Sequence, residues 1–175
     1  MSIEEFLAWL EGRSGAGAAL GCTDAELQEM LATQGVRAVP DAYASFVRAA
    51  GRGAADFWRG NELFYPQAME NHEALEEAWE LNGRPFEIPE RCYVFASQGG
   101  YEFWWFDDVT VAAPVVVRWI EGDVPQRMFR SFEEWLAVQV RFMQINDELH
   151  ERYLDRGLLY PPNPYPSYDE VRTIH

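Results

Sequence analysis

The segment from Tyr101 to Phe106 limits most strongly how this chain can fold. Its residues, Tyr-Glu-Phe-Trp-Trp-Phe, are apolar on both alternating sides of an extended chain. Because successive side chains of a strand point to opposite faces, this segment predicts a central strand in a sheet that is covered on both faces. Gly99 and Gly100 come directly before it and accept the positive φ of tight turns. They predict a hairpin with a strand at 91–96.

The remaining elements follow from turn signals, capping boxes and apolar periodicity. Thr23 and Ser131, each followed three residues later by glutamate, mark the start of a helix. The predicted strands are 62–65, 91–96, 101–106, 114–120 and 126–129, and the predicted helices are 2–11, 23–35, 40–51, 66–82 and 131–153. N-terminal helices, a central antiparallel sheet and a long C-terminal helix define an α+β fold. Trp104, Trp105 and Trp119 are expected in its core.

We divide the chain into three parts. Residues 1–22 are a first helix and a Gly- and Ala-rich linker, and residues 23–156 form the main domain. Residues 157–175 contain the run Tyr-Pro-Pro-Asn-Pro-Tyr-Pro, which predicts an extended tail. The length of 175 residues fits one domain of ordinary size.

The charge excludes several functions. The chain has 14 basic residues, all of them arginine, against 29 acidic ones, so its formal charge is −15. Direct binding of nucleic acid is not expected, because it needs a positive surface that displaces counterions. The absence of lysine removes Schiff-base chemistry and a phosphate-loop lysine. Since 48% of the residues are hydrophobic, the acidity does not indicate disorder.

The termini, cysteines and histidines predict a cytoplasmic protein without a cofactor. Acidic residues stand at the N-terminus where a signal peptide has positive charge, and no apolar run is long enough to span a bilayer. Cys22 and Cys92 are far apart in the sequence and are expected to be free thiols. The three histidines share no ligand spacing with the cysteines, so we predict no metal site.

A carboxylate-based hydrolase is the catalytic alternative. Its candidate residues are Glu102, Asp107, Asp108, Glu121 and Asp123. We favour the interpretation of Asp107 and Asp108 as turn residues, because acidic residues are common where a strand ends. The chain also lacks a strand–turn–helix motif with a nucleophilic serine. No catalytic residue is therefore predicted.

The candidate binding residues are aromatic, basic and acidic. Trp58 and Arg59 lie in a segment without helical or alternating pattern, and loops are where binding residues concentrate. We expect the helix after Pro66 to expose a row of unpaired glutamates, Glu70, Glu73, Glu76, Glu77 and Glu80, whose mutual repulsion a basic partner would relieve. The predicted partner-binding residues are Trp58, Arg59, Glu70, Glu73, Glu77, Asp107, Asp108, Glu121 and Asp123.

The order of motifs resembles the SUKH superfamily, the Smi/Knr-like domain of bacterial immunity proteins and fungal cell-wall regulators. Residues 39–47 are similar to its Pro…Tyr…Phe helix, and Gly51 stands at its glycine turn. Residues 93–107 resemble its glycine hairpin that ends in aspartate, and residues 128–136 its closing helix start. The resemblance covers about 23–140.

This resemblance implies a binding module without catalytic activity. Bacterial members typically neutralise a toxin of the nuclease or deaminase class by occluding its active site. The expected partner is thus a cognate basic protein toxin, bound by a monomer or a weak homodimer. A general interaction or regulatory scaffold, as in the fungal members, is the alternative. A charge of −15 agrees with the first function, because it steers the chain towards a positively charged cleft.

Overall fold

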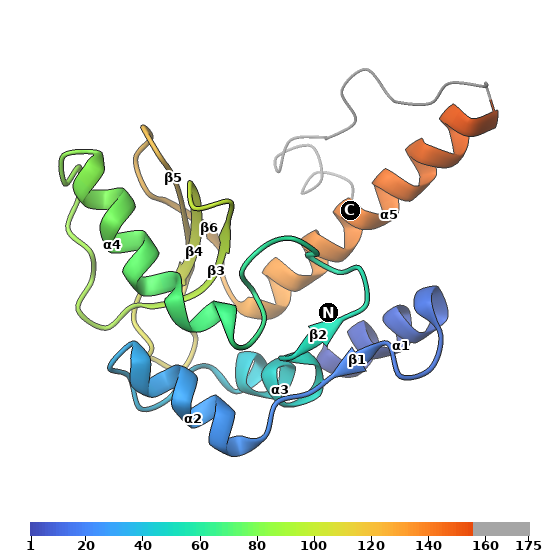
Figure 1. Ribbon diagram of the computed structural model, residues 1–175, viewed down its shortest axis with the longest axis horizontal. Coiled ribbons are helices and arrows are strands. Elements are labelled where there is room, and N and C mark those ends of the chain that lie inside the picture. The colour runs from blue at the N-terminus through green and yellow to red at the C-terminus, as the bar shows by residue number, and fades with distance from the viewer. Residues whose placement is uncertain (156–175) are drawn as a thin grey trace.

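The computed structural model describes residues 1–155 and has the predicted α+β fold. A four-stranded antiparallel sheet has the order β3-β4-β5-β6, and β1 and β2 form a separate two-stranded ribbon (Figure 1). The strands are β1 (Ala19–Leu20), β2 (Gly53–Ala54), β3 (Tyr93–Gln98), β4 (Glu102–Phe106), β5 (Val116–Ile120) and β6 (Gln126–Phe129). The helices are α1 (Ile3–Ser14), α2 (Asp24–Thr33), α3 (Asp41–Ala50), the 3₁₀ helix η1 (Gln67–Glu70), α4 (Asn71–Leu81) and α5 (Phe132–Asp155).

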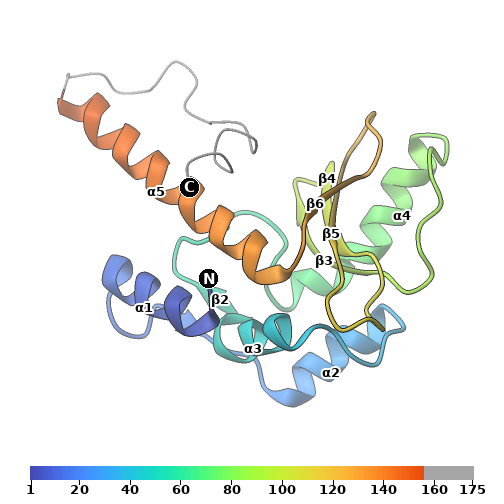
Figure 2. The same cartoon turned by 180° about the vertical axis from the view of Figure 1, so that it is seen from behind.

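The aromatic strand β4 lies inside the sheet, and all five of its residues are buried. Trp104 and Phe106 pack into the larger core, which α1, α2, α3 and α5 also line. Phe103 and Trp105 point to the other face and pack with Leu75 of α4 in a second cluster. Figure 2 shows α4 alone on that side of the sheet. The prediction of a strand covered on both faces is therefore confirmed.

Capping interactions begin the helices where the sequence predicts them. The hydroxyl of Thr23 accepts the N–H of Glu26, and the Glu26 carboxylate accepts the N–H of Thr23. Ser131 caps α5 through the N–H of Glu134. The Glu134 carboxylate accepts the N–H of Arg130. Both caps satisfy N–H groups that a helix leaves without an internal partner.

The segment before α4 differs from its prediction. Residues 62–65 do not form a strand, because only Glu62 pairs, through an isolated bridge with Ser97. The Asn71 side chain donates to the Glu62 carbonyl at 2.8 Å and holds the segment in a turn. The helix predicted from Pro66 is divided into η1 and α4.

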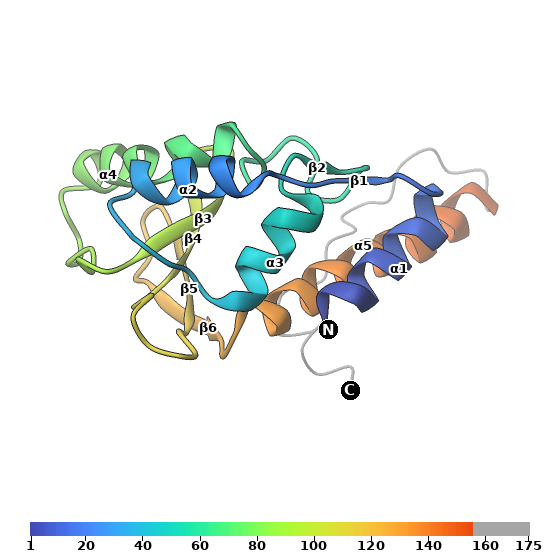
Figure 3. The same ribbon diagram turned by 90° about the horizontal axis from the view of Figure 1, so that it is seen from below.

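The N-terminal part packs on the main domain. Its predicted linker contains β1, which pairs with β2 in an antiparallel ribbon. Helices α1 and α5 lie side by side, as Figures 1 and 3 both show. Helix α5 agrees with its predicted range to within two residues and continues beyond the sheet. The predicted proline-rich tail, 157–175, lies outside the described residues.

Candidate partner-binding surface

The predicted binding residues lie in four separate places. Trp58 and Arg59 are in the β2–η1 loop, Glu70, Glu73 and Glu77 are on η1 and α4, Asp107 and Asp108 follow β4, and Glu121 and Asp123 lie in the β5–β6 turn. The N–H of Glu121 donates to the carbonyl of Tyr101, so Glu121 lies at the start of β4 and Asp107 at its end. At about 3.3 Å per residue, about 20 Å separate these two ends.

That separation matters for the hydrolase alternative. Two catalytic carboxylates of a glycosidase stand about 5 to 10 Å apart, so Asp107 and Glu121 do not form such a pair. Glu102 is buried and accepts a hydrogen bond from Arg118 at 2.8 Å. No group of three or more His, Cys, Asp and Glu side chains within residues 1–155 is arranged to hold a metal ion.

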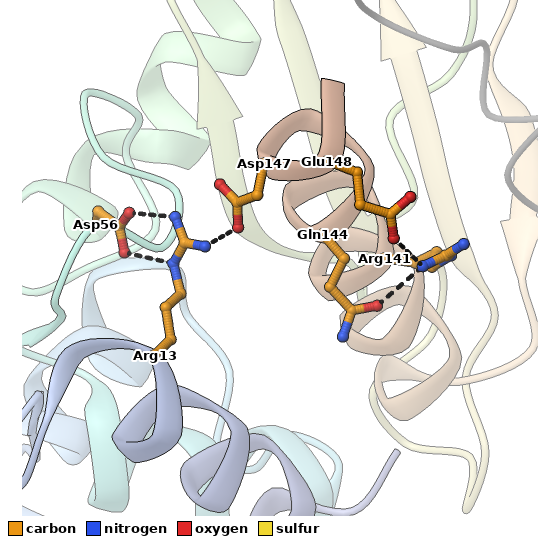
Figure 4. Close-up of polar contacts among 6 residues, drawn as sticks. All are labelled: Arg13, Asp56, Arg141, Gln144, Asp147 and Glu148. Carbon is orange, nitrogen blue, oxygen red and sulfur yellow. Dashed lines mark hydrogen bonds and ion pairs between the residues drawn. The ribbon is translucent and has the colours of Figure 1, made fainter. Parts of the chain in front are cut away.

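The loop that carries Trp58 and Arg59 is held next to helices α1 and α5 by polar contacts. Arg13 of α1 donates to Asp56 from two nitrogens, at 2.7 and 3.3 Å, and also contacts Asp147 of α5 (Figure 4). The hydrogen bonds from Arg13 lower the pKa of Asp56. We name this three-residue contact the Arg13 clamp.

Trp58 itself is turned towards the protein. Its indole N–H donates to the Gln139 side chain at 3.2 Å, and its ring lies 5.1 Å from that of Trp135. The residue is half-buried and has φ of 53°, a region that non-glycine residues rarely adopt. Arg59 beside it is exposed and forms no ion pair within residues 1–155. Of this pair, only Arg59 is thus open to a partner.

Asp107 and Asp108 both organise the turn after β4, as the turn interpretation expects. Asp107 accepts the N–H of Val115 at 3.0 Å and pairs with Arg127 of β6 at 2.6 Å. Asp108 accepts the N–H and the hydroxyl of Thr110, and these bonds lower its pKa. Their carboxylates are therefore engaged within the chain.

The acidic face of α4 is present, but it is paired in part. Arg84 pairs with Glu80 at 2.7 Å, and His72 lies 3.5 Å from Glu76. The expectation of an unpaired row is therefore wrong at Glu80, and Glu76 has a histidine within 3.5 Å. The glutamates at 70, 73 and 77 are exposed and form no ion pair within the described part of the chain.

A chain of contacts connects α4 to the β5–β6 turn. The indole N–H of Trp79 donates to the Phe86 carbonyl at 2.7 Å, and the Phe86 ring lies 5.1 Å from that of Trp119. Trp119 in turn donates to the Asp123 carbonyl at 3.0 Å. The C-terminal turn of α4 and the turns of both hairpins consequently lie at one end of the sheet, as Figures 1 and 2 show.

Exposed apolar side chains gather at the same end. Tyr101 is 46% exposed, Val124 70% and Leu81 87%. Glu121 and Asp123 stand beside the first two, are exposed, and have no ion pair within residues 1–155. We call Tyr101, Glu121, Asp123 and Val124 the sheet-end surface. Tyr101 and Val124 were not among the predicted site residues, although their positions in turns are a signal of exposure.

The described part of the chain is an α+β domain with a four-stranded antiparallel sheet. The model of the SMI1 / KNR4 family (SUKH-1) matches residues 21–138, about two thirds of the chain. The chain belongs to this family, which confirms the resemblance seen in its motifs. No curated protein matches the chain. None of the helices within residues 1–155 is long and apolar enough to cross a bilayer.

Proposed function

We propose that this protein is an immunity protein that neutralises a basic bacterial toxin by covering its active site. The observation that carries the proposal is the sheet-end surface, where unpaired acidic residues flank exposed Tyr101 and Val124. Energetically important interface residues are typically aromatic anchors surrounded by a polar rim. Membership of the SUKH-1 family supports the same function. In this proposal the protein acts in the cytoplasm and needs no cofactor.

The chemistry of the surface fits a nuclease or deaminase. Such a toxin needs positive charge around its cleft to hold nucleic acid. Carboxylates of Glu121 and Asp123 would occupy the positions of phosphates, and α4 adds the glutamates at 73 and 77 on the adjoining face. Tyr101 and Val124 would bury apolar area at the centre, where a charge-only contact would be weak.

The experiment is co-expression with any small basic toxin that the neighbouring open reading frames encode. We expect growth to be rescued and a complex to elute from size-exclusion chromatography. The double variant Tyr101→Ser/Val124→Ser should weaken binding by roughly 10- to 100-fold, since two anchors are removed. Absence of both rescue and complex would show that the proposal is wrong.

A matched pair of charge variants tests the location. Glu121→Gln/Asp123→Asn removes two charges at the sheet end, and Glu11→Gln/Glu151→Gln removes two from exposed positions on α1 and α5. We expect the first variant to bind the toxin more weakly and the second to bind normally. If both variants lost the same amount of binding affinity, net charge would account for the loss, and the sheet-end surface would be rejected as the binding site.

A further inference from the structure

A cleft of about 430 Å³ opens at the end of the sheet away from the sheet-end surface. Three segments that are distant in sequence line it: Gly35–Ala38 after α2, residues 90–91 before β3, and residues 109–110 after β4. It contains none of the predicted binding residues.

Hydrogen bonds fix the walls of this cleft. The buried side-chain amide of Gln34 accepts the N–H of Val94 at 2.8 Å and donates to its carbonyl at 2.9 Å, which holds the end of α2 on β3. The N–H of Val109 donates to the Arg91 carbonyl at 3.0 Å. This bond connects the wall formed by residues 90–91 to the wall formed by residues 109–110. The cleft is therefore preformed, so a ligand would not have to order it.

Two arginines line the cleft without a carboxylate partner. Within residues 1–155, Arg37 and Arg91 form no ion pair, whereas eight other arginines do: Arg13, Arg48, Arg52, Arg84, Arg118, Arg127, Arg141 and Arg152. A guanidinium nitrogen of Arg91 lies 3.5 Å from the Thr110 hydroxyl. The chain has 29 acidic residues, so two arginines without an ion pair around one cleft form a local basic site on an acidic protein.

Two acidic side chains, Glu90 and Asp108, lie near these arginines without forming an ion pair with them. Glu90 lines the cleft but forms no ion pair within the described residues. Asp108 attracts Arg91 electrostatically, and its carboxylate accepts the N–H and the hydroxyl of Thr110. Half-buried Val36 and Val109 add apolar wall.

We propose that this cleft binds a small organic acid, with its carboxylate between Arg37 and Arg91 and its apolar part against Val36 and Val109. The planar guanidinium fork matches a carboxylate in shape and in charge. The apolar walls favour an acid that carries a ring or short alkyl group over acetate. This site does not depend on the proposed toxin-binding function.

The test is a titration of the full chain followed by NMR, with benzoate, acetate and inorganic phosphate as separate probes. We expect saturable shifts of the backbone amides of Val36 and Thr110 with benzoate, and weaker binding of acetate. Tighter binding of phosphate than of benzoate would overturn the assignment to a carboxylate. No saturable shift with benzoate would overturn the site itself.

Matched variants locate the binding. Arg37→Gln/Arg91→Gln should weaken benzoate binding by roughly tenfold or more, because two charge-assisted contacts are lost. Arg130→Gln/Arg152→Gln removes the same charge from exposed positions outside the cleft and should leave binding unchanged. Equal binding by both double variants would reject the cleft. Because its arginines are distant from Tyr101 and Val124, either proposal can fail while the other holds.

Discussion

Single residues in this protein show how burial changes chemical reactivity. Cys22 and Cys92 are free and buried, as expected from their spacing. Burial raises the pKa of Cys92 to about 12, and it raises the pKa of Cys22 despite the attraction of Arg52. Both thiols are thus held in the neutral form at physiological pH, and the thiolate is the reactive species.

Thiol labelling checks this conclusion. At pH 8 we expect Ellman's reagent to modify both cysteines slowly in the folded protein and rapidly in denaturant. The Cys92→Ser variant should lose one of the two denatured-state equivalents. Rapid modification of Cys92 in the native state would contradict its burial and its raised pKa.

Gln34 provides the second residue-scale prediction. Its side chain makes two buried hydrogen bonds to Val94, so Gln34→Ala leaves an N–H and a carbonyl of the sheet edge without partners. We expect a loss of about 1 to 3 kcal/mol in the free energy of unfolding, measured by urea denaturation. Gln28→Ala, at an exposed position of the same helix, should change it by less than about 0.5 kcal/mol.

At the scale of elements, the sequence predicted the parts whose signals are local. Strand β4 and the caps of α2 and α5 are specified by a few adjacent residues, and each forms where expected. The β1–β2 ribbon and the bridge between Glu62 and Ser97 depend on segments that meet only after folding. The segments of the ribbon carry no pattern that distinguishes them from loops, whereas residues 62–65 have the pattern of a strand but lie in a turn. For the same reason the contacts of Trp58 with Gln139 and Trp135 could not be predicted from its position in a loop.

The Arg13 clamp joins α1, the β2–η1 loop and α5, so its removal should weaken the packing of these three elements. Arg13→Ala should lower the free energy of unfolding by up to about 1 kcal/mol, because the contacts are partly exposed to solvent. Arg48→Ala, which removes the more exposed pair with Asp24, should have a smaller effect.

The contribution of the clamp depends on pH. The pKa of Asp56 is lowered in the folded state, so its share of the stability is present above the unfolded pKa of about 3.9 and is lost as pH falls through the lower folded value. The difference between wild type and Arg13→Ala should therefore be largest near pH 7 and shrink in acid. A constant difference down to pH 2 would contradict this contribution of Asp56.

The whole molecule carries a charge of −15, and this charge gives a prediction about rate. If the field of the protein steers a basic toxin, the association rate should fall clearly between low and physiological ionic strength, while dissociation changes less. Stopped-flow mixing over a salt series measures both. An association rate independent of salt would show that the acidity does not guide the encounter.

The two outer strands of the sheet limit the ways in which any partner can attach. At β3, the Gln34 amide occupies the N–H and carbonyl of Val94, and the backbone of Glu62 occupies those of Ser97. At the other edge, β6 has only four residues, and Arg127 on it is paired with Asp107. A blocked edge at β3 and a short strand with a paired charge at β6 are poor templates for an added strand. We therefore expect a partner to contact side chains at the turns and helices, where substitutions leave the sheet unchanged.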